Sequence, residues 1–278
     1  MSKREDKEKS KEEVSPMRVV VYSDIHAPFQ DDRAIELVNK FCGWYQPQRV
    51  VLIGDVIDFY AISKFDKSPR RATNEAMVEE VDTTQRILKG IRGANPKAKI
   101  QMVVGNHEFR LRKFIFKLQA EVPLLATMLD ISGVGLEELL GLMLNLNGLG
   151  IELVDLDPEM AKFTDCYVTI GKIHIGHWDK VNKYAGYTAK NLIADKGVDI
   201  IQGHTHRVGS SFRRTLGGLI EAHEIGCLCG LKPQYTSEKD WQHGFAVIEG
   251  NSTMAKFTIT PVAIKDYEFW FGGKHFKG

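Results

Sequence analysis

Five short motifs along the chain combine aspartate, asparagine and histidine with glycine. In chain order they are Asp24-Ile-His26, Gly54-Asp55-Val-Ile-Asp58, Gly105-Asn106-His107-Glu108, Gly176-His177 and Gly203-His204-Thr-His206. Carboxylate, amide and imidazole ligands without thiolate suit divalent ions such as manganese, iron, zinc or nickel. The set is too large for one ion and does not resemble a closed structural zinc site. It predicts two ions that share a carboxylate, an arrangement suited to phosphoryl chemistry.

The spacing inside the motifs predicts how the ligands are shared. Asp24 and His26 are two residues apart, so on an extended strand end their side chains would leave on the same side and hold one ion together. His204 and His206 have the same spacing, and we expect the same geometry. Asp55 follows a glycine and has two carboxylate oxygens, which are enough to bridge two ions.

The remaining histidines and cysteines lack such support. His174 lies within a predicted strand, and we interpret it, together with His223, His243 and His275, as structural or surface residues. Four cysteines are too few and too irregular for a disulfide framework. Cys227 and Cys229 form one CxC pair without a second pair, so buried thiols are a better interpretation than a zinc site.

The elements that must position the motifs have the rhythm of an α/β protein. We predict buried strands at 18–23, 48–53 and 99–104 and helices at 31–44 and 74–92. After residue 151 we predict a helix at about 185–194 and strands at 167–170, 173–175, 200–201, 220–225, 245–248 and 256–259. Each motif directly follows a predicted strand. Loops beyond the carboxyl ends of strands converge on one crevice in an open α/β sheet, so the five motifs should meet in space. Leucine-rich helical spacing, broken by Pro123, Gly133 and Gly135, predicts a helical insertion at about 109–150.

Composition limits the class of protein. The 278 residues are 43% hydrophobic and 26% charged, which is ordinary for a globular chain. A net charge of +1 argues against a surface that binds nucleic acid everywhere, although it allows a local basic cleft. No apolar stretch is long enough to span a membrane, and residues 1–16 lack the apolar region of a secretory signal. We expect a cytoplasmic protein with a disordered charged tail at 1–16 and one domain at 17–278.

The motif order resembles the calcineurin-like metallophosphoesterase family, and especially its small bacterial and phage members. That family is marked by D-x-H, G-D-x-x-D, G-N-H-[DE], G-H and G-H-x-H, and the match runs from Asp24 to His206. The resemblance implies a four-layer α/β/β/α sandwich of two sheets. It assigns Asp24, His26, Asp55 and His206 to one ion, and Asp55, Asn106, His177 and His204 to the other. We expect manganese, with iron, zinc, nickel and cobalt as alternatives.

The resemblance also implies catalytic roles. His107 would stand near the scissile phosphate, oriented by Asp58, and protonate the leaving group or stabilise the transition state; histidine is suited to this because it titrates near neutral pH. A metal-bound hydroxide would be the nucleophile, without a covalent enzyme intermediate. One departure stands out, because many members have glycine after the fourth-motif histidine and this chain has Trp178. We expect Trp178 to narrow the cleft or to offer its ring to a base.

Three functions are compatible with these motifs. We favour a phosphodiesterase acting on nucleotides or nucleic acid, such as a nuclease, because basic residues flank the motifs. They are Arg70, Arg71, Arg110, Arg112, Lys113 and Arg207, and Asn106, Arg110, Arg207 and Trp178 are the expected substrate contacts. A phosphomonoesterase or protein phosphatase would use the same metals. An inactive binding scaffold is disfavoured because all seven ligands are present. The sequence leaves the oligomeric state open.

Overall fold

The computed structural model describes residues 16–63, 73–128, 135–154, 162–232 and 240–278. The predicted tail up to residue 15 and the pair Arg70 and Arg71 lie outside these residues. None of the described helices is both long and apolar enough to cross a membrane.

The first sheet contains the strands that were predicted most clearly. Its strands lie in the order β11-β10-β1-β2-β3-β4. Their bounds are β1 Met17–Tyr22, β2 Arg49–Ile53, β3 Lys99–Val103, β4 Ile151–Leu153, β10 His243–Gly250 and β11 Phe257–Ile264. Strands β1 to β4 are parallel, with Val20 opposite Val50 and Val50 opposite Ile100. Their β-branched runs are buried, as expected for a sheet covered on both faces.

The second sheet comes from the other half of the chain. Its strands lie in the order β5-β6-β7-β9-β8. The bounds are β5 Tyr167–Ile170, β6 Ile173–Gly176, β7 Asp199–Gln202, β8 Val208–Thr215 and β9 Gly218–Ile225. Strands β6, β7 and β9 are parallel, and the edge strands β5 and β8 pair antiparallel to their neighbours.

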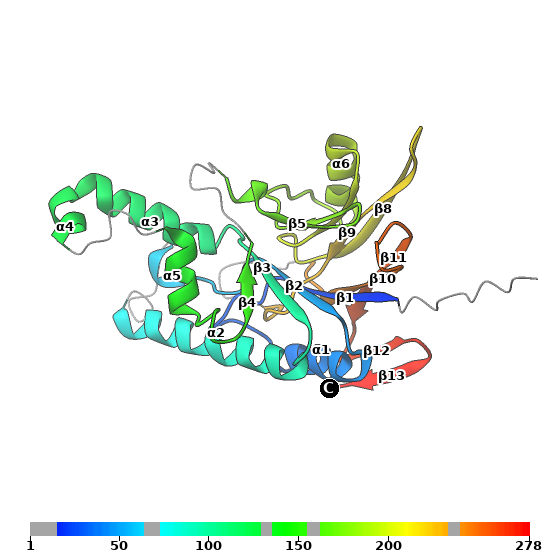
Figure 1. Ribbon diagram of the computed structural model, residues 1–278, viewed down its shortest axis with the longest axis horizontal. Coiled ribbons are helices and arrows are strands. Elements are labelled where there is room, and N and C mark those ends of the chain that lie inside the picture. Colours follow the sequence, from blue (N-terminus) through cyan, green and yellow to red (C-terminus); the bar gives the residue numbers. More distant parts are fainter. Residues whose placement is uncertain (1–15, 64–72, 129–134, 155–161, 233–239) are drawn as a thin grey trace, which may run out of the picture.

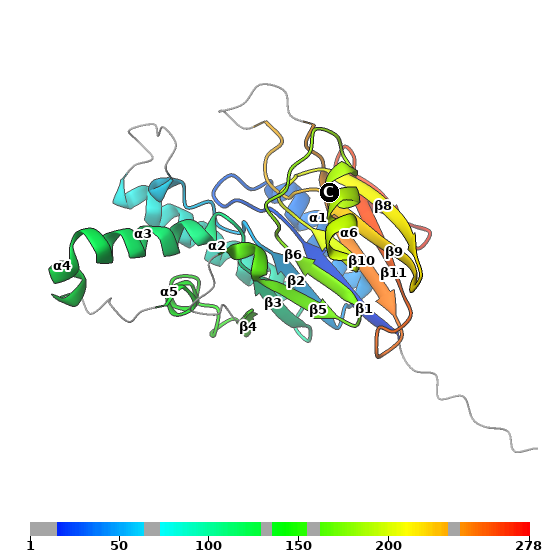
Figure 2. The same cartoon turned by 90° about the horizontal axis from the view of Figure 1, so that it is seen from above.

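Helices cover the outer faces of the two stacked sheets (Figures 1 and 2). Helices α1 (Asp32–Tyr45) and α2 (Asn74–Ala94) lie against the first sheet, and α6 (Tyr187–Lys196) lies against the second. Strand β7 shows how the layers form, because Ile201 belongs to the main core and its neighbour Ile200 packs in a smaller core with α6. This alternation is the period of a strand with both faces buried. The predicted four-layer α/β/β/α sandwich is confirmed.

Polar caps fix where the two long helices begin. The Asp31 carboxylate accepts a hydrogen bond from the Ala34 amide at 3.0 Å, and the Thr73 hydroxyl accepts one from the Ala76 amide at 3.2 Å. Such caps satisfy backbone donors that a helix leaves unpaired in its first turn. Short 3₁₀ turns follow the second strand at η1 (Tyr60–Ile62) and precede β5 at η3 (Phe163–Asp165).

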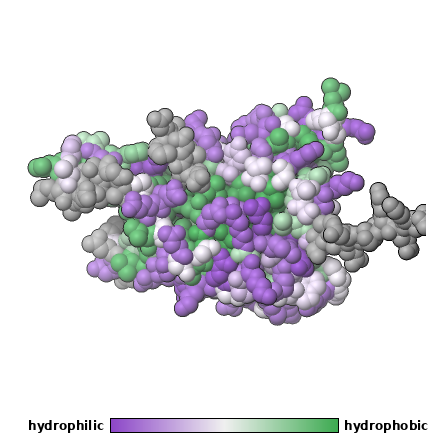
Figure 3. Space-filling view, viewed as in Figure 1, coloured by the Kyte–Doolittle hydropathy of each residue, from purple (hydrophilic) through white to green (hydrophobic). Residues whose placement is uncertain are grey.

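The predicted helical insertion consists of α3 (Glu108–Glu121), α4 (Pro123–Met128) and α5 (Leu136–Met143). Helices α3 and α4 project from the sandwich as an arm (Figure 1). Figure 3 shows apolar surface at the free end of the arm, where Leu124 is exposed. At the other end of the chain, a hairpin of β12 (Glu268–Phe271) and β13 (Lys274–Lys277) packs phenylalanine rings on Phe41 of α1.

Candidate metal centre

The structure brings all seven predicted ligands together at the carboxyl ends of β1, β2, β3, β6 and β7. One group consists of Asp24, His26 and His206, and a second consists of Asp55, His177 and His204. Within each group the potential ligand atoms all lie within 4.8 Å of one another. Asn106 joins the second group, since its Oδ1 lies 3.0 Å from His177 Nε2.

Asp55 stands between the two groups. Its Oδ2 atom lies 3.2 Å from His177 Nε2 and 3.6 Å from His26 Nε2. Its Oδ1 atom accepts a hydrogen bond from the His107 amide at 2.9 Å, which fixes the direction of the carboxylate. The side chain is therefore placed to contact a cation in either group, as a bridging ligand must.

The partners of the histidines show that this donor set fits metal ions. His26 Nδ1 lies 2.9 Å from Asp58 Oδ2, and His177 Nδ1 lies 2.9 Å from the carbonyl oxygen of Ile53. In a neutral imidazole the nitrogen that donates to such a partner carries the proton, so the other nitrogen presents a lone pair. His26 Nε2 and His206 Nε2 face each other at 3.2 Å, as do His177 Nε2 and His204 Nδ1. Lone pairs that converge in this way fit a cation between them.

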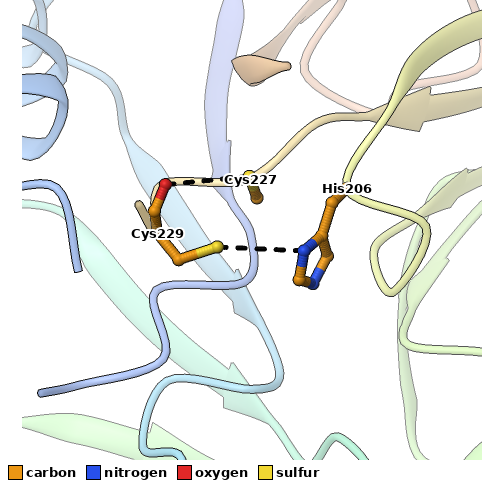
Figure 4. A group of neighbouring side chains, drawn as sticks. All are labelled: His206, Cys227 and Cys229. Atoms are coloured by element: carbon orange, nitrogen blue, oxygen red, sulfur yellow. Dashed lines mark hydrogen bonds between the residues drawn. The ribbon is translucent and has the colours of Figure 1, made fainter. Parts of the chain in front are cut away.

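His206 has an unusual outer partner. Its Nδ1 atom lies 3.8 Å from the Cys229 thiol, and Cys227 lies beside this pair (Figure 4). All four cysteines are free and buried, which agrees with their interpretation as buried thiols. The other nitrogen of His206 lies 2.9 Å from Asp24 Oδ1 and faces the first ligand group.

Charges in the centre shift the pKa values of its members. Burial alone would raise the pKa of Asp24, but His206 and His177 outweigh it and hold this pKa far below its usual range. Burial would lower the pKa of His177, yet Asp55 and Asp24 raise it to about 9. Burial and the neighbouring His177 lower the pKa of His204 to about 4. Carboxylates thus make the centre strongly favourable for positive charge.

The backbone at the ligands differs from the predicted extended geometry. Asp24 and His26 have φ angles of 51° and 52°, and His204 and His206 have φ angles of 71° and 57°. These residues lie in the left-handed region, which costs of order 1 to 3 kcal/mol for a residue with a Cβ and is concentrated at functional sites. The same-side geometry expected for His204 and His206 is wrong, because the chain turns between them. The two side chains lie in different ligand groups, which is the division that the family resemblance implies.

Glycines allow the motif loops to pack against one another. Gly54 has a φ of 83°, and a Cβ at this position would lie 2.6 Å from the backbone of Gly105. A Cβ on Gly105 would overlap Oδ1 of Asp55. The second and third motifs can therefore come together only because both positions lack a side chain.

Sequence reasoning gave Glu108 no role, and the structure shows that it organises the centre. This carboxylate is completely buried at the start of α3. Its Oε2 accepts from the amides of Asp55 and Gly105 at 2.9 Å, and its Oε1 accepts from Val56 at 2.7 Å and Ile57 at 3.2 Å. Glu108 thereby holds the loop that carries Asp55. Its place in the third motif was the only available signal.

His107 and Asp58 lie beside the ligand groups. His107 Nδ1 is 2.9 Å from the Asp58 carbonyl and 3.2 Å from the Asp58 carboxylate, which also contacts His26. Arg110 donates to the Asp58 carbonyl at 2.9 Å and lies 3.0 Å from His107 Nε2. Because a guanidinium only donates, His107 Nε2 accepts this bond and the proton of the neutral ring sits on Nδ1.

A cleft of about 580 Å³ opens over the two groups. Its floor includes ligands of both groups and His107, and Arg207 lies on its wall as expected. The wall also contains Lys183 and Trp241, which sequence reasoning did not select. The Trp241 ring lies edge-on to His206, with centroids 4.1 Å apart. Trp241 lies far along the chain from the motifs, so no spacing pattern indicated it.

Several predicted substrate contacts lie elsewhere. Trp178 is only 3% exposed and packs with Leu192 and Ile193 of α6, so the expectation that its ring faces the cleft is wrong. The ring is instead buried in the smaller core between the second sheet and α6. Arg112 is buried against the rings of Phe109 and Phe116, and Lys113 lies over Phe109. Among the described basic residues that were expected near the cleft, Arg110 and Arg207 remain as candidate contacts.

The chain is similar to a family model, to phage proteins and to solved structures. The model of the calcineurin-like phosphoesterase family matches residues 17–208. The gene 54 protein of Mycobacterium phage L5 is 27% identical over 262 residues, which cover 88% of this chain and 93% of the relative. Among solved structures, Vps29 from Entamoeba histolytica has a TM-score of 0.42 at 14% identity, covering 93% of this chain and 96% of its own. The E. coli phosphoesterase YfcE has a TM-score of 0.36 at 12% identity, covering 88% and 99%. The chain belongs to the calcineurin-like phosphoesterase family.

Proposed function

We propose that this protein is a dinuclear metal-dependent phosphodiesterase that acts on nucleotides or nucleic acid. The observation that carries the proposal is the position of Asp55, which lies between two groups of metal-ligating side chains on the floor of one cleft. His107 stands beside both groups, with its Nε2 atom 3.7 Å from Asp55 Oδ2. Family membership and these clusters together support a binuclear divalent centre.

Each ligand group would hold one cation. The first cation would be held by Asp24, His26, Asp55 and His206, and the second by Asp55, Asn106, His177 and His204. When bound, two divalent cations supply Lewis-acid stabilisation of charge on a phosphoryl group and make water available as a nucleophile. Mixed oxygen and nitrogen ligands without thiolate are compatible with manganese, which is our proposed metal, and also with iron, zinc, nickel or cobalt.

His107 would protonate the leaving-group oxygen. For this role its Nε2 must carry a proton and face the substrate, but in the present arrangement Nε2 accepts from Arg110. A phosphate oxygen in the cleft offers Arg110 a stronger, charge-assisted partner. When the Arg110 guanidinium donates to the phosphate instead, His107 Nε2 is free to take up a proton from solvent. The Asp58 carboxylate stays in contact with Nδ1 and stabilises the protonated ring.

The shape and charge of the cleft favour a diester over a monoester. The cleft continues from the metal ligands to Val181, Lys183 and Trp241, so its lining extends beyond the residues that would hold the cations. Lys183 and Arg207 add positive charge to its wall. Neighbouring phosphates of a nucleotide or polynucleotide can use these contacts, whereas a small monoester cannot.

The test compares two chromogenic substrates. Metal-free protein is reconstituted with manganese, iron, zinc, nickel or cobalt singly and assayed on bis-p-nitrophenyl phosphate and p-nitrophenyl phosphate, with metal-free protein as the control. We expect manganese-dependent hydrolysis with a higher kcat/KM for the diester. A monoester preference of about tenfold or more, without cleavage of any nucleotide diester, would instead identify a phosphomonoesterase. Full metal loading without hydrolysis of either substrate would identify a binding scaffold.

A further inference from the structure

A group of exposed aromatic and basic side chains lies next to the cleft. It is formed by the segment between β6 and α6 and the first turns of α6. Tyr184 and Tyr187 are 57% and 53% exposed, and their ring centroids lie 5.7 Å apart. Lys183 Nζ lies 5.3 Å from the centroid of Tyr184, and Lys190 Nζ lies 5.7 Å from that of Tyr187. These four residues are called the tyrosine platform below.

The segment carrying the platform is held in place by side-chain and backbone hydrogen bonds. The amide of Asn182 donates to the Thr188 hydroxyl at 3.0 Å, and the Asn182 side chain accepts from Asn191 at 3.0 Å. Arg207, directly after the last metal-ligand motif, donates to the Asn182 carbonyl. The platform is therefore built on a fixed loop that is tied to the metal centre, and its exposed rings are not needed to hold that loop.

The platform is continuous with the cleft. Val181 and Lys183 line the cleft wall, so the same loop that closes one side of the cleft presents Tyr184 outside it. Lys180 is paired with Asp195, but within the described part of the chain Lys183 and Lys190 form no ion pair. Asp240 also lines the cleft and carries the opposite charge. The ammonium groups of Lys183 and Lys190 and the exposed rings of Tyr184 and Tyr187 thus remain available beside the proposed metal centre.

We infer that the tyrosine platform binds single-stranded nucleic acid and positions a neighbouring phosphodiester in the metal cleft. This inference rests on the proposed phosphodiesterase function, because it names the class of diester that the same cleft receives. Aromatic rings stack with any unpaired base, and cations beside them contact the backbone phosphates. Duplex bases are already stacked and cannot use the rings. The chemistry of the platform therefore selects single strands without selecting sequence.

Binding is tested without cleavage. Full-length metal-free protein is titrated into a fluorescein-labelled oligothymidylate of about 12 nucleotides, a length within the usual range of single-strand sites, and anisotropy is recorded at several salt concentrations. The double variant Tyr184→Ala/Tyr187→Ala should bind at least about tenfold more weakly, whereas Tyr184→Phe/Tyr187→Phe should bind like wild type because phenylalanine keeps the stacking surface. Lys183→Ala should weaken binding and reduce its salt dependence.

A matched control lies on the β12–β13 hairpin, which is at the bottom of the view in Figure 1, whereas α6 is at the top. Trp270 there is 69% exposed, so Trp270→Ala removes an equally accessible ring and should leave the affinity unchanged. The inference is overturned if the double alanine variant binds as tightly as wild type, or if a duplex of the same length binds more tightly. Hydrolysis of bis-p-nitrophenyl phosphate, which has no nucleobase to stack on the tyrosine rings, should be equal in wild type, the two tyrosine double variants and Trp270→Ala. Lys183→Ala is left out of this comparison because Lys183 lines the cleft. If wild type does not hydrolyse this diester, the proposed phosphodiesterase function is contradicted. The anisotropy result still decides whether the tyrosine platform binds single-stranded nucleic acid.

Discussion

The Asp58 carboxylate links a proposed metal ligand, His26, to the proposed general acid, His107. It contacts Nδ1 of His26 at 2.9 Å and Nδ1 of His107 at 3.2 Å. The same two rings meet edge to face with centroids 4.4 Å apart. One carboxylate therefore sets the orientation of two imidazoles with different tasks. Only His26 belongs to the predicted ligand set, so the two histidines can be separated by substitution.

Replacing His107 by alanine should slow turnover without removing metal. We expect His107→Ala to retain its metal content, because no ligand is lost, and to lower kcat by about 10² to 10⁴, the usual range for general acid–base catalysis. Diesters with good leaving groups should be affected less, since they need less protonation. Elemental analysis and kinetics on a leaving-group series measure both effects. An equal loss for good and poor leaving groups would argue against an acid role.

The elements that the sequence predicted well are those whose pattern comes from burial. Strands β1, β2 and β3 were expected within one or two residues of their observed bounds because both of their faces are covered, which favours β-branched runs. The edge strand β8 was not predicted, since its sequence is rich in serine and arginine and much of it is exposed. The hairpin of β12 and β13 also escaped prediction, because its aromatic contacts to α1 join distant parts of the chain.

In the candidate site too, features set by the local sequence were predicted, and features set by contacts between distant segments were not. Convergence of the motifs followed from their positions after strands, a local property. The left-handed backbone at Asp24 and His206 could not be predicted, because it depends on contacts between loops from different strands. Trp178 was assigned to the cleft because it follows His177 in sequence, but the burial of its ring depends on the position of α6. Residues such as Trp241 become neighbours of the centre only through the fold.

Trp178 should matter for stability and not for substrate stacking. Its ring fills the small core between the second sheet and α6, so Trp178→Ala should lower the free energy of unfolding by about 3 to 5 kcal/mol. The folded variant should bind oligonucleotide as wild type does. Urea unfolding and anisotropy measure these two quantities separately. If Trp178→Ala keeps wild-type stability but loses oligonucleotide affinity, the result would indicate that the Trp178 ring contacts substrate.

Glu80 on α2 should give the fold a distinct pH dependence. Its carboxylate accepts from the amides of Tyr60 and Ala61, and burial together with Asp58 raises its pKa from 4.5 to about 7. A folded pKa above the unfolded one stabilises the protein at low pH, and this contribution is lost as pH rises from about 4.5 to 7.

The comparison of wild type with Glu80→Gln isolates this contribution. Between pH 5 and pH 8, the unfolding free energy of metal-free wild type should fall by about 1 to 3 kcal/mol relative to the glutamine variant, which cannot ionise. Urea titrations at a series of pH values provide the measurement. Parallel pH profiles of the two proteins would show that Glu80 ionises normally in the fold.

At the scale of the whole molecule, the metal centre joins the two sheets. Asp24, Asp55 and Asn106 follow strands of the first sheet, whereas His177 and His204 follow strands of the second. A cation bound in either proposed group would therefore contact side chains from both layers. Ligands that bind only the folded state stabilise it by mass action, so metal binding should stabilise the sandwich as one unit.

The central claim is that two cations share Asp55, and metal content per chain tests it most directly. Wild type, Asp55→Ala and Asp24→Ala are loaded with manganese, freed of excess metal and measured by elemental analysis, with folding checked by circular dichroism. Wild type should hold two ions, Asp24→Ala should lose chiefly one, and Asp55→Ala should lose more metal than any other single ligand variant. Retention of two ions per chain by folded Asp55→Ala would contradict the shared ligand.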